Sequence, residues 1–154
     1  MILGGSTFIH VGQVHVDVGP ASISTVLGSC IAVCLYDKYS KIGGMNHYLL
    51  PFWNGNGLQT PKFGNISIPR LIDDMLARGA NLKTMEAKIF GGASMNISAQ
   101  NNMMIGEKNI LVAQEILKEY KIKIVASDVG GQYGRKIQLK LEQGKVLMKY
   151  TVKQ

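Results

Sequence analysis

The chain has 154 residues, of which 46% are hydrophobic and 18% charged, and its formal net charge is +7. This length fits one domain, residues 1–154, with a core of ordinary size, and the composition is typical of a soluble globular protein. The sequence has no apolar run of membrane-spanning length, and residues 1–12 lack the basic start and apolar core of a signal peptide. These features predict a cytoplasmic protein without membrane insertion.

The positive charge is concentrated toward the C-terminus. From Lys121 onward there are eight cations but only two acidic residues, Asp128 and Glu142. Such a basic surface attracts anionic partners. The sequence has no aromatic stacking pattern, no zinc-ligand spacing and only one Arg-Lys pair, so we expect no nucleic-acid binding and no metal. A solvated basic surface or an acidic protein partner is the expectation that remains.

The first half of the chain predicts strands. Apolar and polar residues alternate at residues 13–18, which is typical of a half-buried strand. Apolar runs at residues 31–36 and 42–50 predict two further strands, separated by a polar turn at residues 37–40. Glycine, asparagine and proline recur through residues 51–64, which we expect to form a loop.

Two helices are predicted from side chains at helical spacing. Ser67 can cap the start of the first helix, and Gly79 fits the position just past its end. The second helix covers residues 106–120. The residues that mark one side of each helix are Ile68, Leu71, Ile72, Met75 and Leu76 in the first, and Ile105, Asn109, Val112, Ala113, Ile116, Leu117 and Tyr120 in the second.

The remaining elements predict an α/β or α+β fold. Residues 87–90 and 122–126 read as short buried strands, and residues 137–141 and 146–152 read as a hairpin. Strands therefore dominate, and the two long helices are expected to pack on a mixed, largely antiparallel sheet system.

The chain has two cysteines, Cys30 and Cys34, four residues apart. In a strand this spacing is roughly 13 Å, which is too long for a disulfide. Without a cluster of further cysteines and histidines the pair does not make a zinc site. At least one of the two is therefore expected to be a free thiol in a reducing compartment.

Cys30 is the candidate nucleophile. It follows Gly28 and Ser29 where a turn enters a strand, so small neighbours leave its thiol approachable. Backbone N–H groups of Gly28 and Ser29 can face a substrate oxygen, which acyl transfer requires. The competing interpretation is a buried structural cysteine, and this is the reading we expect for Cys34, further along the strand.

A hairpin geometry supports His47 as the base for Cys30. If residues 37–40 form a four-residue loop, Tyr36 faces Lys41 and Cys30 lies directly opposite His47. A slip of one residue would oppose Tyr48 instead, and a bulge at the two glycines of the second strand would also change the register.

A hydroxyl group is the expected partner of His47. No acid lies close in sequence, whereas Ser22, Ser24 and Thr25 do, and any of their hydroxyls can accept the imidazole N–H. These residues can equally be turn-forming. His10 and His15 are weaker candidates for the base, because one lies near a terminus and the other on the polar side of its strand.

Five motifs in this order resemble the CheD family of chemoreceptor glutamine deamidases. Each motif alone is weak, but together they extend over most of the chain, from about residue 16 to residue 149. The motifs are LGSCIAVC at residues 27–34, GGMNHYLLP at 43–51, AKIFGGASM at 87–95, IGEKN at 105–109 and DVGG at 128–131.

The resemblance implies a three-layer sandwich akin to the catalytic domain of cytotoxic necrotizing factor toxins. It also implies a cysteine–histidine pair helped by a hydroxyl residue, which here are Cys30 and His47. The third member in the family is often a threonine six residues before the cysteine, and this position is Ser24 here, with the adjacent Thr25 as the alternative. An imidazolium beside the thiol would hold the pKa of Cys30 below that of a free cysteine.

The implied activity is conversion of receptor glutamines to glutamate through a Cys30 thioester, without a cofactor. Some family members also hydrolyse receptor methyl esters, and a CheC-type phosphatase is the implied regulatory partner. Two other functions remain open: a non-catalytic protein that binds receptors or a CheC-like protein, and a transglutaminase-like reaction in which an amine replaces water.

Overall fold

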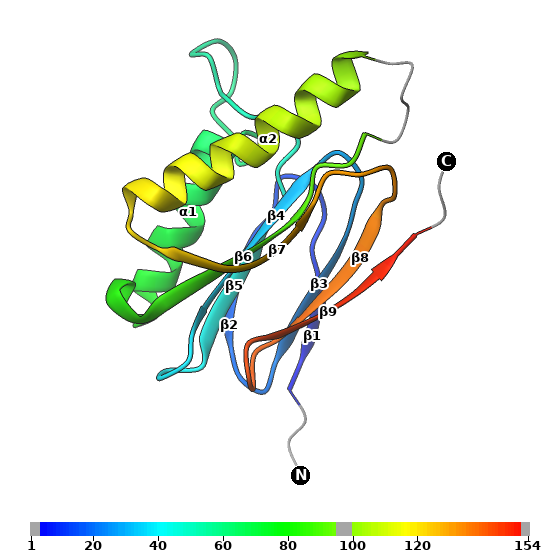
Figure 1. Ribbon diagram of the computed structural model, residues 1–154. Coiled ribbons are helices and arrows are strands. Elements are labelled where there is room, and N and C mark those ends of the chain that lie inside the picture. Colours follow the sequence, from blue (N-terminus) through cyan, green and yellow to red (C-terminus); the bar gives the residue numbers. More distant parts are fainter. Residues whose placement is uncertain (1–3, 95–99, 152–154) are drawn as a thin grey trace.

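The protein was analysed as a computed structural model, which describes residues 4–94 and 100–151. Its strands and helices follow one another along the chain as in Figure 1. They are β1 (Ser6–Phe8), β2 (Val14–Val18), β3 (Ser22–Leu27), β4 (Ile31–Asp37), β5 (Ile42–Asn46), α1 (Gly64–Ala77), the 3₁₀ turn Leu82–Thr84, β6 (Met85–Gly91), α2 (Gln100–Glu119), β7 (Lys123–Val129), β8 (Arg135–Lys140) and β9 (Lys145–Tyr150).

The strands form two sheets. The smaller sheet has the order β1-β3-β8-β9, and the larger sheet has the order β2-β5-β4-β6-β7. The β1/β3 and β6/β7 pairs are parallel, and the other five pairs are antiparallel. The predicted mixed, largely antiparallel sheet system is therefore confirmed.

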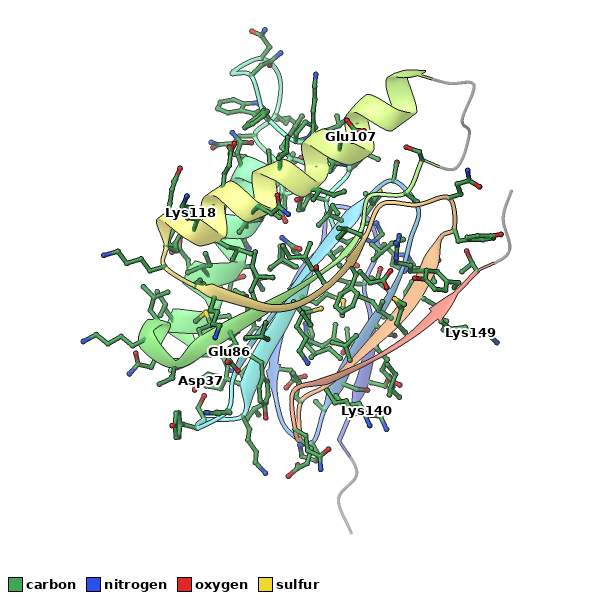
Figure 2. All side chains as sticks on the ribbon, in the orientation of Figure 1. Asp37, Glu86, Glu107, Lys118, Lys140 and Lys149 are labelled. Atoms are coloured by element: carbon green, nitrogen blue, oxygen red, sulfur yellow. The ribbon has the colours of Figure 1, made fainter. Side chains whose placement is uncertain are left out.

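The elements stack in three layers. Both helices cover one face of the five-stranded sheet, and the four-stranded sheet covers the other face (Figure 1). Alternate residues of β4 divide between two cores: Ile31, Val33 and Leu35 pack against the helices, and Ala32 and Cys34 pack between the sheets. Side chains fill both interlayer spaces in Figure 2. The expected three-layer sandwich with two long helices is confirmed.

Most element boundaries differ from the sequence expectation by a few residues. The strands and the C-terminal hairpin occur where they were predicted, although Val152 lies outside the described residues. The predicted cap Ser67 is wrong: α1 begins at Gly64, Phe63 is its N-cap, and Ser67 is buried inside the helix. Gly79 does lie just past the end of α1, with φ of +107°.

The structure differs from the sequence prediction in three further respects. The second helix begins earlier than predicted, at Gln100, and the predicted strand at residues 42–50 ends at Asn46. The strands β1 and β3 were not predicted from the sequence, because their polar residues give only a weak apolar alternation. No helix in the described ranges has the length and hydropathy needed to cross a membrane.

Candidate active site

The hairpin of β4 and β5 sets the position of Cys30. Asp37 pairs with Ile42, and the isolated bridge between Ile31 and Tyr48 continues the same register. Cys30 is therefore opposite Leu49, and the predicted direct pairing with His47 is wrong by two residues. The turn covers residues 38–41 rather than 37–40.

The two-residue shift still leaves Cys30 and His47 on the same face of the sheet. Side chains alternate with a period of two, so an even shift preserves the face. Cys30 and His47 become diagonal neighbours, roughly 7–8 Å apart in the backbone, which is within reach of an imidazole. Both lie on the side of the sheet that faces β3, where Cys30 packs at the margin of the core between the sheets.

The ladder between β4 and β5 is interrupted beside His47. The Asn46 side chain accepts the Val33 N–H at 2.7 Å, in place of a backbone carbonyl. The His47 backbone bonds instead to the segment before β2: its N–H donates to Gln13 O at 3.2 Å, and its carbonyl accepts from Gly12 N at 2.7 Å. The imidazole is thus held at the point where the strand leaves its partner.

Thr25 contacts the imidazole of His47. The Thr25 hydroxyl lies 2.8 Å from His47 Nδ1 and 2.8 Å from the carbonyl oxygen of Ile9. The carbonyl can only accept, so it takes the single hydroxyl proton, and the hydroxyl oxygen must then accept from Nδ1–H. This assigns the proton of neutral His47 to Nδ1 and leaves Nε2 with a free lone pair, as a base requires.

Ser24 does not occupy the place that the resemblance gave it. Thr25 lies between Ile23 and Leu27, which face the core between the sheets, and all three are buried. Ser24 lies on the other face of β3, because neighbouring side chains in a strand point in opposite directions. Thr25, the alternative considered from the sequence, is the hydroxyl residue that the structure brings to His47.

Burial makes both candidate catalytic groups neutral. It raises the pKa of the Cys30 thiol to about 11, against the opposing effect of the thiol's contact with its own backbone N–H. It also lowers the pKa of His47 to about 4, with a smaller contribution from positive charge at His10. The expected depression of the Cys30 pKa is therefore wrong: the resting pair is a thiol and a neutral imidazole.

A glycine-rich segment after β6 lies against the backbone of Cys30, the candidate nucleophile. Gly92 N–H donates to Cys30 O at 2.9 Å, and Ala93 N–H donates to Gly28 O at 3.1 Å. Gly91 has φ of +112°, and a Cβ there would lie 2.1 Å from the Cys30 carbonyl oxygen. Only glycine allows this approach. Met95, the last residue of the motif that includes this segment, lies outside the described residues.

Arg135 holds the adjoining loop after β7 through hydrogen bonds. Its guanidinium is buried, binds the Asp128 carboxylate at 2.8 Å, and donates to the carbonyls of Gly130 at 2.8 Å and Gly91 at 3.3 Å. A hollow of about 420 Å³ opens beside this loop, lined also by Tyr133 and Tyr150. The hollow lies at the same end of the sandwich as Cys30, because Arg135 also binds Gly91, and Gly91 and Gly92 contact the Cys30 backbone.

The other candidate residues lie elsewhere. His15 is half-buried and near Asp17, at 3.4 Å, and Cys34 is fully buried within β4. Both cysteines are free, in agreement with their spacing. Within residues 4–94 and 100–151, no cluster of three His, Cys, Asp or Glu side chains could hold a metal ion.

The sequence did not single out Asn109 and Arg135 as parts of this site. Asn109 is fully buried, and its side-chain amide donates to the carbonyls of Ser29 at 3.2 Å and Leu49 at 2.9 Å. Its position among the apolar residues of the second helix was a usable signal, because an amide on a buried helix face needs partners. Nothing local in the sequence marked Arg135.

The fold has two sheets and one layer of helices, and the candidate site combines Cys30 with the hydrogen-bonded pair of His47 and Thr25. The family model for CheD, described as chemotactic sensory transduction, matches residues 49–150. The chain therefore belongs to the CheD family.

Curated relatives match almost the whole chain. A protein of Sulfurimonas denitrificans is 57% identical over 95% of this chain and 94% of its own length, and one of Trichlorobacter lovleyi is 48% identical over 92% and 88%. A Methanococcus maripaludis protein is 39% identical over 92% of both chains. All three are named "Probable chemoreceptor glutamine deamidase CheD".

Solved structures are more distant. The crystal structure of the Bacillus licheniformis hypothetical protein YfiH aligns with a TM-score of 0.44 at 17% identity, over 70% of this chain and 46% of that chain.

Proposed function

We propose that this protein is a chemoreceptor glutamine deamidase in which Cys30 is the nucleophile, His47 the base and Thr25 the residue that orients the base. The observation that carries the proposal is the hydrogen-bonded chain from His47 Nδ1 through the Thr25 hydroxyl to Ile9 O. It leaves Nε2 free to accept a proton on the face of the sheet that carries Cys30. The names of the relatives support glutamine side chains of chemoreceptors as the substrate.

The first half of the reaction forms a thioester. Cys30 Sγ attacks the glutamine Cδ while its proton passes to His47 Nε2, and the carbonyl oxygen becomes an oxyanion. The N–H of Cys30 serves as the donor for this oxyanion, because it donates to no backbone carbonyl among the described residues and faces its own thiol. Imidazolium at His47 then protonates the leaving amine, so the C–N bond breaks and ammonia departs.

The second half restores the enzyme. Water gives one proton to His47 Nε2 and its oxygen attacks the thioester carbonyl. The C–S bond then breaks, and the proton on His47 returns to Cys30. The sum is glutamine plus water giving glutamate plus ammonia, with no redox step and no cofactor.

Gly28 and Ser29 have a narrower role in the proposal than the sequence suggested. The carbonyls of Gly28 and Ser29 are bound by Ala93 N–H and the Asn109 amide, respectively. This fixes the turn before Cys30 in one orientation. In the proposal Gly28 and Ser29 form the approach to the thiol, and the oxyanion donor is the peptide N–H of Cys30 itself.

The neutral resting pair suits this mechanism. A thiol with a pKa of about 11 is not spontaneously ionised at neutral pH, and an imidazole with a pKa of about 4 is fully available as a base. Proton transfer is then coupled to attack on the substrate. The same neutrality protects the thiol from oxidation between turnovers, because the thiolate is the reactive form.

The partner and location of the reaction are also proposed. Receptor side chains reachable by this protein lie in the cytoplasm, so we place the enzyme there. A CheC-type phosphatase as regulatory partner, and hydrolysis of receptor methyl esters by the same thioester route, are additional proposals that come from the family resemblance.

The decisive experiment is intact-mass analysis of purified receptor cytoplasmic fragments after incubation with the protein. Deamidation replaces NH₂ by OH at each modified glutamine and releases an equal amount of ammonia. We expect both signals with the wild-type protein and neither with Cys30→Ala, whose folding is checked by thermal melting. A folded wild-type protein that binds receptors without changing their mass would instead identify a binding partner.

The same assay distinguishes the other chemistries. Adding a primary amine reports a transglutaminase-like reaction, because the amine would then appear in the receptor mass in place of hydroxyl. A methylated receptor fragment reports esterase activity through release of methanol. We expect deamidation with unmethylated receptor and no incorporated amine.

A further inference from the structure

Asn109 of α2 is a buried side chain that touches the peptide of the nucleophile. Its amide nitrogen Nδ2 donates to Ser29 O at 3.2 Å and to Leu49 O at 2.9 Å. The identity of the nitrogen is set by these partners, since an amide oxygen facing two carbonyl oxygens would be repelled. Both N–H groups of the amide are used, whereas Oδ1 has no partner among the described residues.

Asn109 supplies a hydrogen bond at a point where the backbone ladder of the hairpin is interrupted. After the paired residues Ile31 and Tyr48, the antiparallel pattern would next give Ser29 O the N–H of Leu50. That N–H donates instead to Lys62 O, at 3.0 Å. The Ser29 carbonyl therefore takes its hydrogen bond from the helix layer through Asn109.

This bond sets the direction of the neighbouring N–H. Ser29 C=O and Cys30 N–H belong to one planar peptide unit, and in a trans peptide they point in opposite directions. The cis peptide among the described residues is Gly19-Pro20, so the Ser29-Cys30 unit is trans. Drawing the Ser29 carbonyl toward α2 directs the Cys30 N–H away from the helices, to the face that carries the thiol and His47.

We propose that Asn109 is a positioning residue that aims the Cys30 N–H at the oxyanion formed during deamidation. This rests on the proposed function and deepens it. The contact of that N–H with its own thiol, which opposes the rise in the Cys30 pKa, is consistent with this direction. Asn109 does not touch the substrate and acts only through the peptide it holds.

A second feature supports a role beyond packing. Asn109 is fully buried and shares its face of α2 with Val112 and Ala113 of the helix–sheet core, where an amide is costly unless its donors are used. A leucine of similar size would fill the space without that cost. The amide is thus suited to the two carbonyls rather than to the core.

The test compares Asn109→Ala with Tyr48→Phe. Tyr48 is the matched control because it is also fully buried, and its hydroxyl donates to the backbone carbonyl of Asn109. Tyr48→Phe therefore removes a buried hydrogen bond at the same helix position but leaves the bonds from Nδ2 to Ser29 and Leu49. Both variants should lower the melting temperature.

The two variants should differ in kcat for deamidation of receptor glutamines. Asn109→Ala should lower kcat roughly 10- to 100-fold with KM unchanged, because a misaimed oxyanion donor is lost only in the transition state. Alkylation of Cys30 by iodoacetamide, which forms no oxyanion, should stay within about 3-fold of wild type. Tyr48→Phe should keep wild-type kcat. The proposal is overturned if Asn109→Ala keeps kcat, or if its kcat falls only as far as alkylation does.

A second readout is independent of turnover. The amide resonance of Cys30 in a ¹⁵N–¹H spectrum reports the surroundings of its N–H, so it should move in Asn109→Ala and stay in place in Tyr48→Phe. An unmoved resonance in Asn109→Ala would overturn the proposal even if the enzyme were active. If the wild-type protein showed no deamidation but the resonance moved, the proposed function would fail and the positioning of this peptide by Asn109 would stand.

Discussion

Ionisable groups are buried at both ends of β4, but they differ in how many hydrogen bonds they receive. At the end away from the site, labelled by Asp37 in Figure 2, the carboxylate receives the N–H groups of Asn81 at 2.9 Å and Tyr39 at 3.1 Å and the Thr84 hydroxyl at 2.9 Å. Burial opposes its ionisation, but these hydrogen bonds outweigh burial and hold the pKa of Asp37 below its ordinary value.

At the Cys30 end, the buried groups keep a reactive atom unbound. His47 uses Nδ1 on Thr25, and among the described residues its Nε2 has no hydrogen-bond partner, while Cys30 Sγ has the backbone N–H of its own residue. Burial outweighs the contact of the Cys30 thiol with its own N–H, acts on His47 in the same sense as the charge of His10, and holds both groups neutral. The difference is that hydrogen-bond donors satisfy the carboxylate of Asp37 at one end of β4, whereas the Nε2 acceptor of His47 has no donor within the described ranges at the end that carries the proposed active site.

The largest expected contrast is in the reactivity of the two cysteines. Cys30 is half-buried at the start of β4, whereas Cys34 is 2% exposed and burial raises its pKa to about 12. Iodoacetamide should modify Cys30 in the native protein, increasingly as pH rises toward 11. Cys34 should react only after denaturation, as peptide mapping can show. Equal native labelling of both thiols would remove the distinction between the two ends.

Thr25 should matter for turnover and Ser24 should not. Thr25→Ala removes the acceptor of the Nδ1–H of His47 and should lower kcat by on the order of 100-fold. Thr25→Ser keeps the hydroxyl and should restore much of the activity, and Ser24→Ala on the opposite face of β3 is the matched control. A greater loss in Ser24→Ala than in Thr25→Ala would show that the hydrogen bond to His47 has no catalytic role.

The two ends should respond to acid in different pH windows. His47 has a folded pKa of about 4 against 6.5 unfolded, so the unfolded chain binds more protons between these values. Stability from this group is present above pH 6.5 and is lost as pH falls toward 4, by about 3 kcal/mol in all. His47→Gln should flatten the free energy of unfolding in this window, as urea titrations at each pH can measure.

Asp37 supplies the matched control for that experiment. Its folded pKa is lowered from 3.8, so its contribution is present above that value and is lost only as pH falls further. Asp37→Asn should leave the slope between pH 4 and 6.5 unchanged. A flattened slope in this window from Asp37→Asn, with none from His47→Gln, would reverse the assignment of the two ends.

The smallest expected effect is the replacement of Cys34. Cys34→Ala removes one buried sulfur from the core between the sheets and should cost about 1 kcal/mol in the free energy of unfolding. Deamidation should remain at the wild-type level. A loss of turnover comparable with that of Cys30→Ala would place Cys34 in the reaction.

The sequence predicted most of the strands but not the register that places Cys30 and His47 relative to each other. Apolar runs predicted the strands next to Cys30 and His47, which lie just before β4 and just after β5, since such runs are a local property of the sequence. Their register came out two residues off, because the four-residue turn covers residues 38–41 rather than 37–40, and moving a turn by one residue along the chain changes every pairing by two. An even error preserves the face, so Cys30 and His47 lie on the same side of the sheet although they are not directly opposite.

The hydroxyl partner shows what a local reading misses. Whether Ser24 or Thr25 faces His47 depends on how β3 packs against β8 and β1, and that is a long-range contact. Ile9 O, which assigns the Thr25 proton, comes from a segment that the sequence did not mark at all. The contacts of Asn109 and Arg135 with peptide carbonyls are equally long-range, and no periodicity reports them.

The central claim is that Thr25 fixes His47 with its proton on Nδ1, so that Nε2 is the base for Cys30. The ¹⁵N chemical shifts of the His47 imidazole measure this directly, with His47→Gln used to assign the signals and His10 and His15 as internal comparisons. The account predicts the neutral tautomer with Nδ1–H and bare Nε2 at pH 5 to 8, where the ring stays unprotonated because its pKa is about 4. A neutral ring protonated at Nε2, or an imidazolium at pH 7, would contradict it.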